Sequence, residues 1–77
     1  MQARVKKPTL LQIREQHHLT LLDISEASQV EDRIVWYALI GREVTREEAI
    51  QILAGVNTLA NTKYTLEDIR INVAEMK

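Results

Sequence analysis

Four threonines in this 77-residue chain mark places where a helix can begin. Each is followed three residues later by a side chain that can accept a hydrogen bond from the threonine's own backbone, the pattern called a capping box. The pairs are Thr9 with Gln12, Thr20 with Asp23, Thr45 with Glu48, and Thr65 with Asp68. Aspartate is a weaker partner than glutamate or glutamine, but the sequence predicts a helix after each of these threonines.

The spacing of apolar residues predicts how far the helices run. Apolar side chains three and four residues apart share one face of a helix, and that face is buried when the chain folds. The expected helices cover about residues 10–17, 21–28, 31–40, a longer stretch between the Thr45 cap and Asn61, and about 65–69. We therefore expect an all-α protein, a compact bundle of five short helices.

The residues predicted to fill the core follow the same spacing. They are Leu10, Ile13, Ile24, Ala27, Val30, Val35, Ala38, Ala49, Ile52, Leu53, Val56, Leu59 and Ala60, with Ile50 broadening the stripe of the long helix. Gly55 lies inside that helix at a cost of roughly 1 kcal/mol relative to alanine, which favours a close approach of another helix there. Gly41, Asn61 and His18 suit helix ends, because each tolerates left-handed backbone.

The chain after the last predicted helix has a different pattern. Ile69, Ile71 and Val73 alternate with residues that are polar or small. Alternation of this kind is typical of extended chain, but a frayed helix end produces it equally well over so few residues. Both conformations stay open for residues 70–77.

Residues 19–41 are the most informative stretch for function, because they are expected to fold as two short helices joined by a tight turn. In such a helix-turn-helix the second helix, here 31–40, presents its outer face, and in DNA-binding proteins that helix enters the major groove. The side chains opposite the apolar stripe are the candidate base contacts. They are Asp32, Arg33, Trp36 and Tyr37.

Composition and charge fit one small domain. A hydrophobic content of 45% and the absence of cysteine favour a single domain over residues 9–77 without disulfides. No apolar run is long enough to cross a membrane and the N-terminus lacks an apolar signal core, so we expect a cytoplasmic protein with no membrane partner. Within residues 1–8, Arg4, Lys6 and Lys7 favour a basic arm that contacts DNA phosphates, and a solvated, disordered terminus is the alternative.

A set of core and cap positions spans residues 10–69. They are Leu10, Ile13, Arg14, Leu19, Thr20, Ile24, Ala27, Val30, Val35, Ala38, Gly41 and the segment Thr-Leu-Glu-Asp-Ile at 65–69. Together they resemble the xenobiotic-response-element family of helix-turn-helix regulators, which includes the lambda and 434 phage repressors and Cro. The resemblance implies a lambda-repressor-like DNA-binding domain, with base contacts at the four positions given above and phosphate contacts at Thr20, Arg42 and Arg46.

Some positions depart from the family pattern. Leu21 stands where a glutamine often contacts a phosphate, and Leu39 stands where a glutamate is common. Gln29 replaces the glycine of the turn, which removes the residue that adopts positive φ most easily. Glu31 and Asp32 place negative charge where the helix would approach phosphates, and this repulsion weakens non-specific DNA affinity.

A single module of this size contacts few bases, so the protein is expected to bind double-stranded DNA as a homodimer. Two recognition helices roughly 34 Å apart would then meet successive major grooves of a palindrome. Apolar residues near the C-terminus supply a candidate dimer surface, and the alternative is that they complete the core of the monomer. They are Leu59, Tyr64, Leu66, Ile69, Ile71 and Val73.

Two other classes of function deserve comparison. A net charge of -1 and the acidic start of the recognition helix favour a module for protein association, antitoxin-like or adaptor, that docks a protein partner on the Trp36 face. For Trp36 itself, DNA contact, partner contact and core packing stay open. An enzyme is not expected, because cysteine is absent and two glycines form no phosphate loop. His17 and His18 are adjacent and point in different directions, so no metal or other cofactor is expected.

Overall fold

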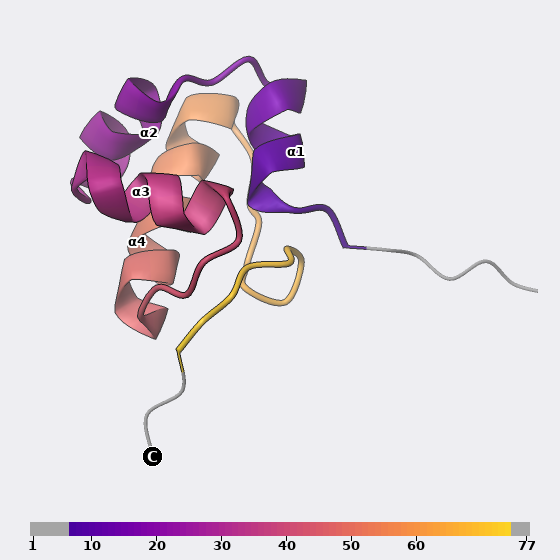
Figure 1. Ribbon diagram of the computed structural model, residues 1–77. Coiled ribbons are helices and arrows are strands. Elements are labelled where there is room, and N and C mark those ends of the chain that lie inside the picture. Colours follow the sequence, from indigo (N-terminus) through magenta and orange to yellow (C-terminus); the bar gives the residue numbers. More distant parts are fainter. Residues whose placement is uncertain (1–6, 75–77) are drawn as a thin grey trace, which may run out of the picture.

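The computed structural model describes residues 7–74, which form an all-α globule (Figure 1). Its helices are α1 (Leu10–Gln16), α2 (Leu21–Ser28), α3 (Asp32–Leu39) and α4 (Arg46–Ala60). α2 packs against both α3 and α4, and α3 also contacts α1. The described part of the chain has four helices and no strand, only two isolated β-bridges.

Three of the four predicted capping boxes begin helices. The hydroxyls of Thr9, Thr20 and Thr45 accept hydrogen bonds from backbone N–H groups three residues later, at 3.0–3.1 Å. In return the side chain at that third position accepts from the threonine N–H, at 2.9–3.1 Å. These caps confirm the predicted starts of α1, α2 and α4, since each pair satisfies two donors that a bare helix end leaves unpaired.

The predicted fifth helix over 65–69 is wrong, because the structure has only a turn there. The Asp68 carboxylate accepts from both the backbone N–H and the hydroxyl of Thr65, at 2.9 and 3.0 Å. The Arg70 N–H then donates to the Pro8 carbonyl at 2.8 Å, and the Ile69 side chain is buried. The capping residues are therefore used, but the Asp68 N–H closes a single turn on the Thr65 carbonyl, the Arg70 N–H binds a distant segment, and no helix continues.

The segment 70–74 is extended, which settles the choice left open by the sequence for these residues. Parallel bridges join Arg70 to Thr9 and Val73 to Val44. Val44 donates its N–H to the Asn72 carbonyl at 3.1 Å and accepts from the Ala74 N–H at 2.8 Å. In Figure 1 this segment is yellow and runs alongside the connection between α3 and α4.

Most of the predicted core residues are buried, and the exceptions share a cause. The core contains Leu10, Ile13, Ile24, Val30, Val35, Ala38, Leu39, Val44, Ala49, Ile52, Leu53, Val56 and Ile69. Ala27, Ile50 and Leu59 were predicted to be buried but are exposed, and Ala60 is only half-buried. A helical stripe predicts which face turns inward, but the neighbouring chain decides how wide the buried face is.

Gly55 confirms the predicted close approach of a helix and explains the error at Ala27. A Cβ atom placed on Gly55 would lie 2.7 Å from the backbone nitrogen of Ser28 and 2.8 Å from its Cβ. Because α2 rests on α4 through Ser28, this residue is buried and Ala27 turns to solvent. The absence of a side chain at Gly55 therefore sets the position of α2.

Candidate nucleic-acid interface

α3 has one face in the core and the opposite face in solvent. Val35, Ala38 and Leu39 are buried. Arg33 is exposed, and Trp36 keeps 51% of its surface accessible. The prediction that these two side chains project into solvent is confirmed, so of the three interpretations of Trp36, burial in the core is excluded. Asp32 is exposed as well.

The turn between α2 and α3 is held by hydrogen bonds from two serines. Gln29 closes α2 in the left-handed region at φ 62°, and its N–H donates to the Ser25 carbonyl at 2.8 Å. The Ser25 hydroxyl donates to the Val30 carbonyl at 2.7 Å, and the Ser28 hydroxyl accepts from the Val30 N–H at 3.3 Å. Val30 is also buried, so the turn is held on both sides of Gln29. This is why Gln29 can adopt a positive φ although it is not a glycine.

Neither serine was predicted from the sequence to hold this turn. Ser25 and Ser28 stand three residues apart at the end of an amphipathic helix, where their side chains can bond to the backbone of the turn. That pattern was available, but serine at these positions is equally common on a solvated helix face. The close packing of Ser28 on Gly55 is what buries this residue, and its hydroxyl then bonds to the backbone of the turn.

The electrostatics at the start of α3 are mixed. Glu31 occupies the N-cap position and makes no side-chain capping hydrogen bond. Instead its Oε1 lies 3.2 Å from Nη2 of Arg33, and the two side chains are 73% and 68% exposed. An exposed pair of this kind is weak, so Arg33 can exchange this carboxylate for another acceptor.

Tyr37 and Arg42 pack against each other at the far end of α3. Gly41 turns the chain at φ 89°, and the Arg42 N–H then donates to the Tyr37 carbonyl at 2.8 Å. The Arg42 guanidinium lies 5.0 Å from the centre of the Tyr37 ring, within range of a cation–π interaction. Tyr37 is half-buried, so its ring is less available for bases than Trp36 and supports an exposed cation.

The remaining predicted phosphate contacts are spread over the surface. The Thr20 hydroxyl caps α2 as an acceptor and keeps its own proton for donation. Arg46 is exposed in the first turn of α4, and Lys7 is exposed ahead of α1. Arg4 and Lys6 lie outside the residues that the structure describes, as does most of the predicted 1–8 arm.

The predicted dimer residues fall into separate places. Ile69 is 2% exposed, so it belongs to the core and offers no surface to a second chain. Leu59 is exposed near the end of α4. Tyr64 and Leu66 are half-buried beside a groove on α4, and Ile71 and Val73 are half-buried on the extended segment. Much of this apolar set packs on the monomer core, which was the alternative interpretation.

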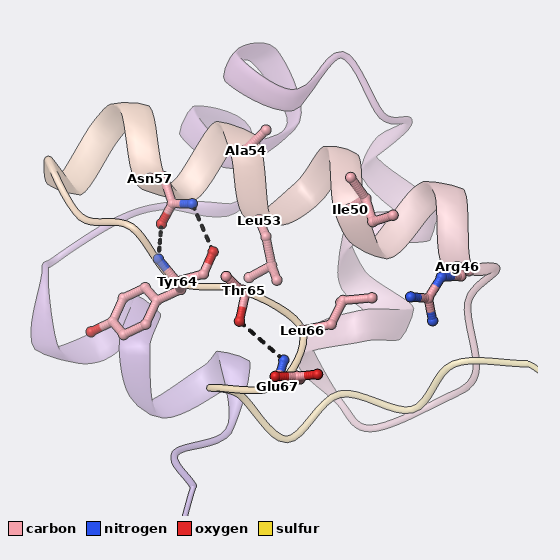
Figure 2. A pocket seen from close by; sticks show the side chains of 9 residues that line it. All are labelled: Arg46, Ile50, Leu53, Ala54, Asn57, Tyr64, Thr65, Leu66 and Glu67. Carbon is pink, nitrogen blue, oxygen red and sulfur yellow. Dashed lines mark hydrogen bonds between the residues drawn. The ribbon is translucent and has the colours of Figure 1, made fainter.

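The groove has a volume of about 550 Å³ and runs between α4 and residues 64–67 (Figure 2). Ile50, Leu53 and Leu66 supply its apolar wall, and Arg46 lies at one end. At the other end the Asn57 side chain donates to the Tyr64 carbonyl at 3.0 Å and accepts from the Tyr64 N–H at 2.8 Å. Asn57 therefore holds the chain that follows α4, a role that was not predicted from the sequence.

Residues 7–74 were also compared with the requirements of a metal site and of a membrane-spanning helix. No group of three or more His, Cys, Asp and Glu side chains there is placed to hold a metal ion. His18 adopts φ 57° after α1, as its position at a helix end predicted. No helix in this part of the chain has the length and apolar character that crossing a bilayer requires.

Comparison of the chain with models of known protein families, with curated proteins and with solved structures gave no match. The chemistry of the candidate interface must therefore be inferred from the side chains that α3 and its flanking turns present.

Proposed function

We propose that this protein is a sequence-specific DNA-binding regulator of the lambda-repressor-like helix-turn-helix type, acting in the cytoplasm as a homodimer. The observation that carries the proposal is the two-sided character of α3. One face is fixed in the core by Val35 and Ala38, and the other carries Arg33 and Trp36 in solvent. A helix held in this way can enter a major groove without rearrangement.

The base contacts follow from the chemistry of the exposed side chains. Arg33 leaves its weak pair with Glu31 and donates two hydrogen bonds to O6 and N7 of a guanine. Asp32 accepts from N4 of a cytosine, and Trp36 contacts a thymine methyl group or a sugar. Each good polar pair of this kind is worth about 1–3 kcal/mol of discrimination between bases.

Phosphate contacts come from groups on the turn after α3, at the starts of α2 and α4, and ahead of α1. Arg42 is held over the Tyr37 ring, so less side-chain freedom is lost when it binds a phosphate. Tyr37 keeps part of its ring exposed and contacts the sugar beside that phosphate. Thr20 donates from its hydroxyl at the start of α2, and Lys7 and Arg46 add charge farther out.

The acidic residues Glu31 and Asp32 shape the expected selectivity. They repel phosphates wherever α3 approaches DNA in a wrong register, which weakens non-specific binding. In a matching register Asp32 meets a cytosine amino group and Arg33 meets a guanine, so the repulsion is offset. We expect weak binding to random duplex and a large gain on a preferred site.

The proposal is tested by selecting bound sequences from a random duplex pool at about 50 mM salt, followed by binding titrations. We expect an enriched palindrome. Arg33→Ala should weaken binding to it by at least about tenfold and relax the preference at one base pair of each half-site. Lys63→Ala is the matched control, because Lys63 is an exposed cation beyond α4. If no duplex is enriched, or if both variants behave alike, the proposal is refuted.

A second candidate function is protein association through the same helix. It is favoured by exposed apolar side chains on α3 and its C-cap, where Trp36 is 51% and Ile40 47% accessible, and by Leu22 on α2, which is 59% accessible. Such residues are typical anchors of protein interfaces. A stoichiometric protein partner that is lost on Trp36→Ala, but retained on Arg33→Ala, would favour this function over DNA binding. The opposite sensitivity would count against it.

A further inference from the structure

Among residues 7–74, the extended segment 70–74 is paired along one edge and open along the other. Along an extended chain, the N–H and C=O of successive residues point to opposite sides. The Arg70 N–H faces Pro8, while the Asn72 carbonyl and the Ala74 N–H face Val44, so the even-numbered residues all use one side. The N–H and C=O groups of Ile71 and Val73 point the other way, and within residues 7–74 none of them has a hydrogen-bond partner.

Between Ile71 and Ala74 this open edge lacks the features that protect edges from pairing. Natural edge strands carry charged side chains, proline or a bulge, since unpaired backbone groups otherwise attract another chain. The residues Ile-Asn-Val-Ala at 71–74 include neither charge nor proline, and the one charged residue of the segment is Arg70 at its start. Ile71 and Val73 have high β-propensity and are half-buried, so part of their apolar surface remains to be covered.

We propose that the Ile71–Val73 edge is the dimer surface, and that its occupant is the same edge of a second copy running antiparallel. With Asn72 of the two copies opposite each other, Ile71 of one copy pairs with Val73 of the other. The open N–H and C=O groups of both residues then bind one another, as in a hydrogen-bonded antiparallel pair. This arrangement is two-fold symmetric, which is the symmetry a palindromic DNA site requires.

The segment is also firmly joined to the candidate recognition helix. Asn72 donates from its side-chain amide to the Gly41 carbonyl, directly after α3, and Val44 bonds to the backbone on both sides of Val73. The dimer axis would therefore lie at a fixed position relative to α3 in each copy. Two half-sites at one spacing follow from this link, in contrast to a dimer joined by a loose tail.

The inference rests on the proposed function in one respect, that the protein is a homodimer. It can be tested without DNA. Sedimentation equilibrium of the full chain should give a mass that approaches twice the 8.9 kDa of one chain as concentration rises. Val73→Pro removes the N–H on the open edge and leaves the bonds of Val44 intact. It should raise the dissociation constant of the dimer by about tenfold or more, because each copy loses a donor.

Two variants serve as matched controls. Val73→Ala keeps the N–H and shortens the side chain, so it should weaken the dimer much less than the proline variant. Leu66→Ala alters the α4 groove, the competing apolar surface, and should leave the mass unchanged. Amide hydrogen exchange of the unmodified protein gives a readout that needs no variant: exchange at Ile71 and Val73 should slow as the concentration increases.

The outcomes separate this inference from DNA binding. A monomer at every concentration, or a dimer with the same dissociation constant in Val73→Pro, would overturn the proposed surface. If Leu66→Ala weakens the dimer and Val73→Pro does not, the dimer surface would be the α4 groove. A dimer that Val73→Pro dissociates, but that selects no duplex, would refute the DNA proposal and uphold this one.

Discussion

The turn between α2 and α3 is held by sequence neighbours alone, whereas the segment 62–74 is held both by nearby Asn57 and by residues far from it in the chain. Ser25, Ser28 and Gln29 fix the turn through bonds that span a few residues. The C-terminal segment depends on Asn57, seven residues before Tyr64, and on Pro8 and Val44, which are far from it in the chain. Local sequence patterns therefore predict the first region well and the second poorly.

The capping boxes show the same difference at two matched sites. Thr45 and Thr65 are each followed by an acidic residue three positions later. Thr45 begins a helix of fifteen residues, and Thr65 begins only a turn. After Thr45 an apolar stripe buries one face of the helix, but after Thr65 the backbone pairs with Pro8 instead. A cap favours a helix only when the next turns also bury apolar surface.

The largest expected effect on stability comes from filling the contact between α2 and α4. Gly55→Val places a branched side chain within 3 Å of Ser28 backbone atoms, so one helix must move. We expect a loss of about 3 kcal/mol in the free energy of unfolding, the upper part of the range for overpacked cores. Urea denaturation measures it, with Gln51→Ala on the exposed side of α4 as control. Equal stability of the two variants would contradict the close contact.

A smaller loss is expected from releasing the segment after α4. Asn57→Ala removes the bonds to the Tyr64 N–H and carbonyl and to the Thr62 hydroxyl. We expect a loss of about 2 kcal/mol, since partly buried backbone groups are left without partners. Thr62→Ala removes only one of these bonds, so thermal unfolding should show a loss less than half as large. A similar effect of both variants would show that the Tyr64 bonds matter little.

The smallest effects are expected at the two threonine caps, where the comparison is most direct. Thr45→Ala should cost about 1 kcal/mol, the usual effect of removing an N-cap. Thr65→Ala should cost less than about half of that, because only the two exposed bonds of the Thr65 hydroxyl within a turn are lost. Urea denaturation of both variants under one condition gives the difference. A larger loss at Thr65 would mean that this turn, and not the helix cap, stabilises the fold.

The sequence predicted the parts of the candidate interface that depend on helix periodicity. The exposure of Arg33 and Trp36 followed from the spacing of Val35 and Ala38, and the helix starts followed from the threonine caps. Residues whose roles depend on a distant partner could not be assigned. Ser28 is buried only because Gly55 lies against it, and Asn57 has a role only because Tyr64 returns to α4.

The same reasoning explains the stacking of Tyr37 and the split of the predicted dimer residues. Tyr37 lies on α3 between exposed Trp36 and buried Ala38, at the border of the two faces. The apolar spacing alone therefore could not predict that its ring packs against Arg42. Ile69 and Ile71 share one alternating pattern, yet the turn at 66–68 directs Ile69 into the core and leaves Ile71 on the extended segment.

The fluorescence of Trp36 tests the central claim most directly, because it is the only tryptophan in the chain and lies on the exposed face of α3. The emission is recorded while the duplex enriched from the random pool is added at about 50 mM salt, and again after the salt is raised. Contact with DNA predicts quenching that saturates with duplex and reverses at high salt. Unchanged emission under conditions where the duplex is bound would show that α3 does not face the DNA.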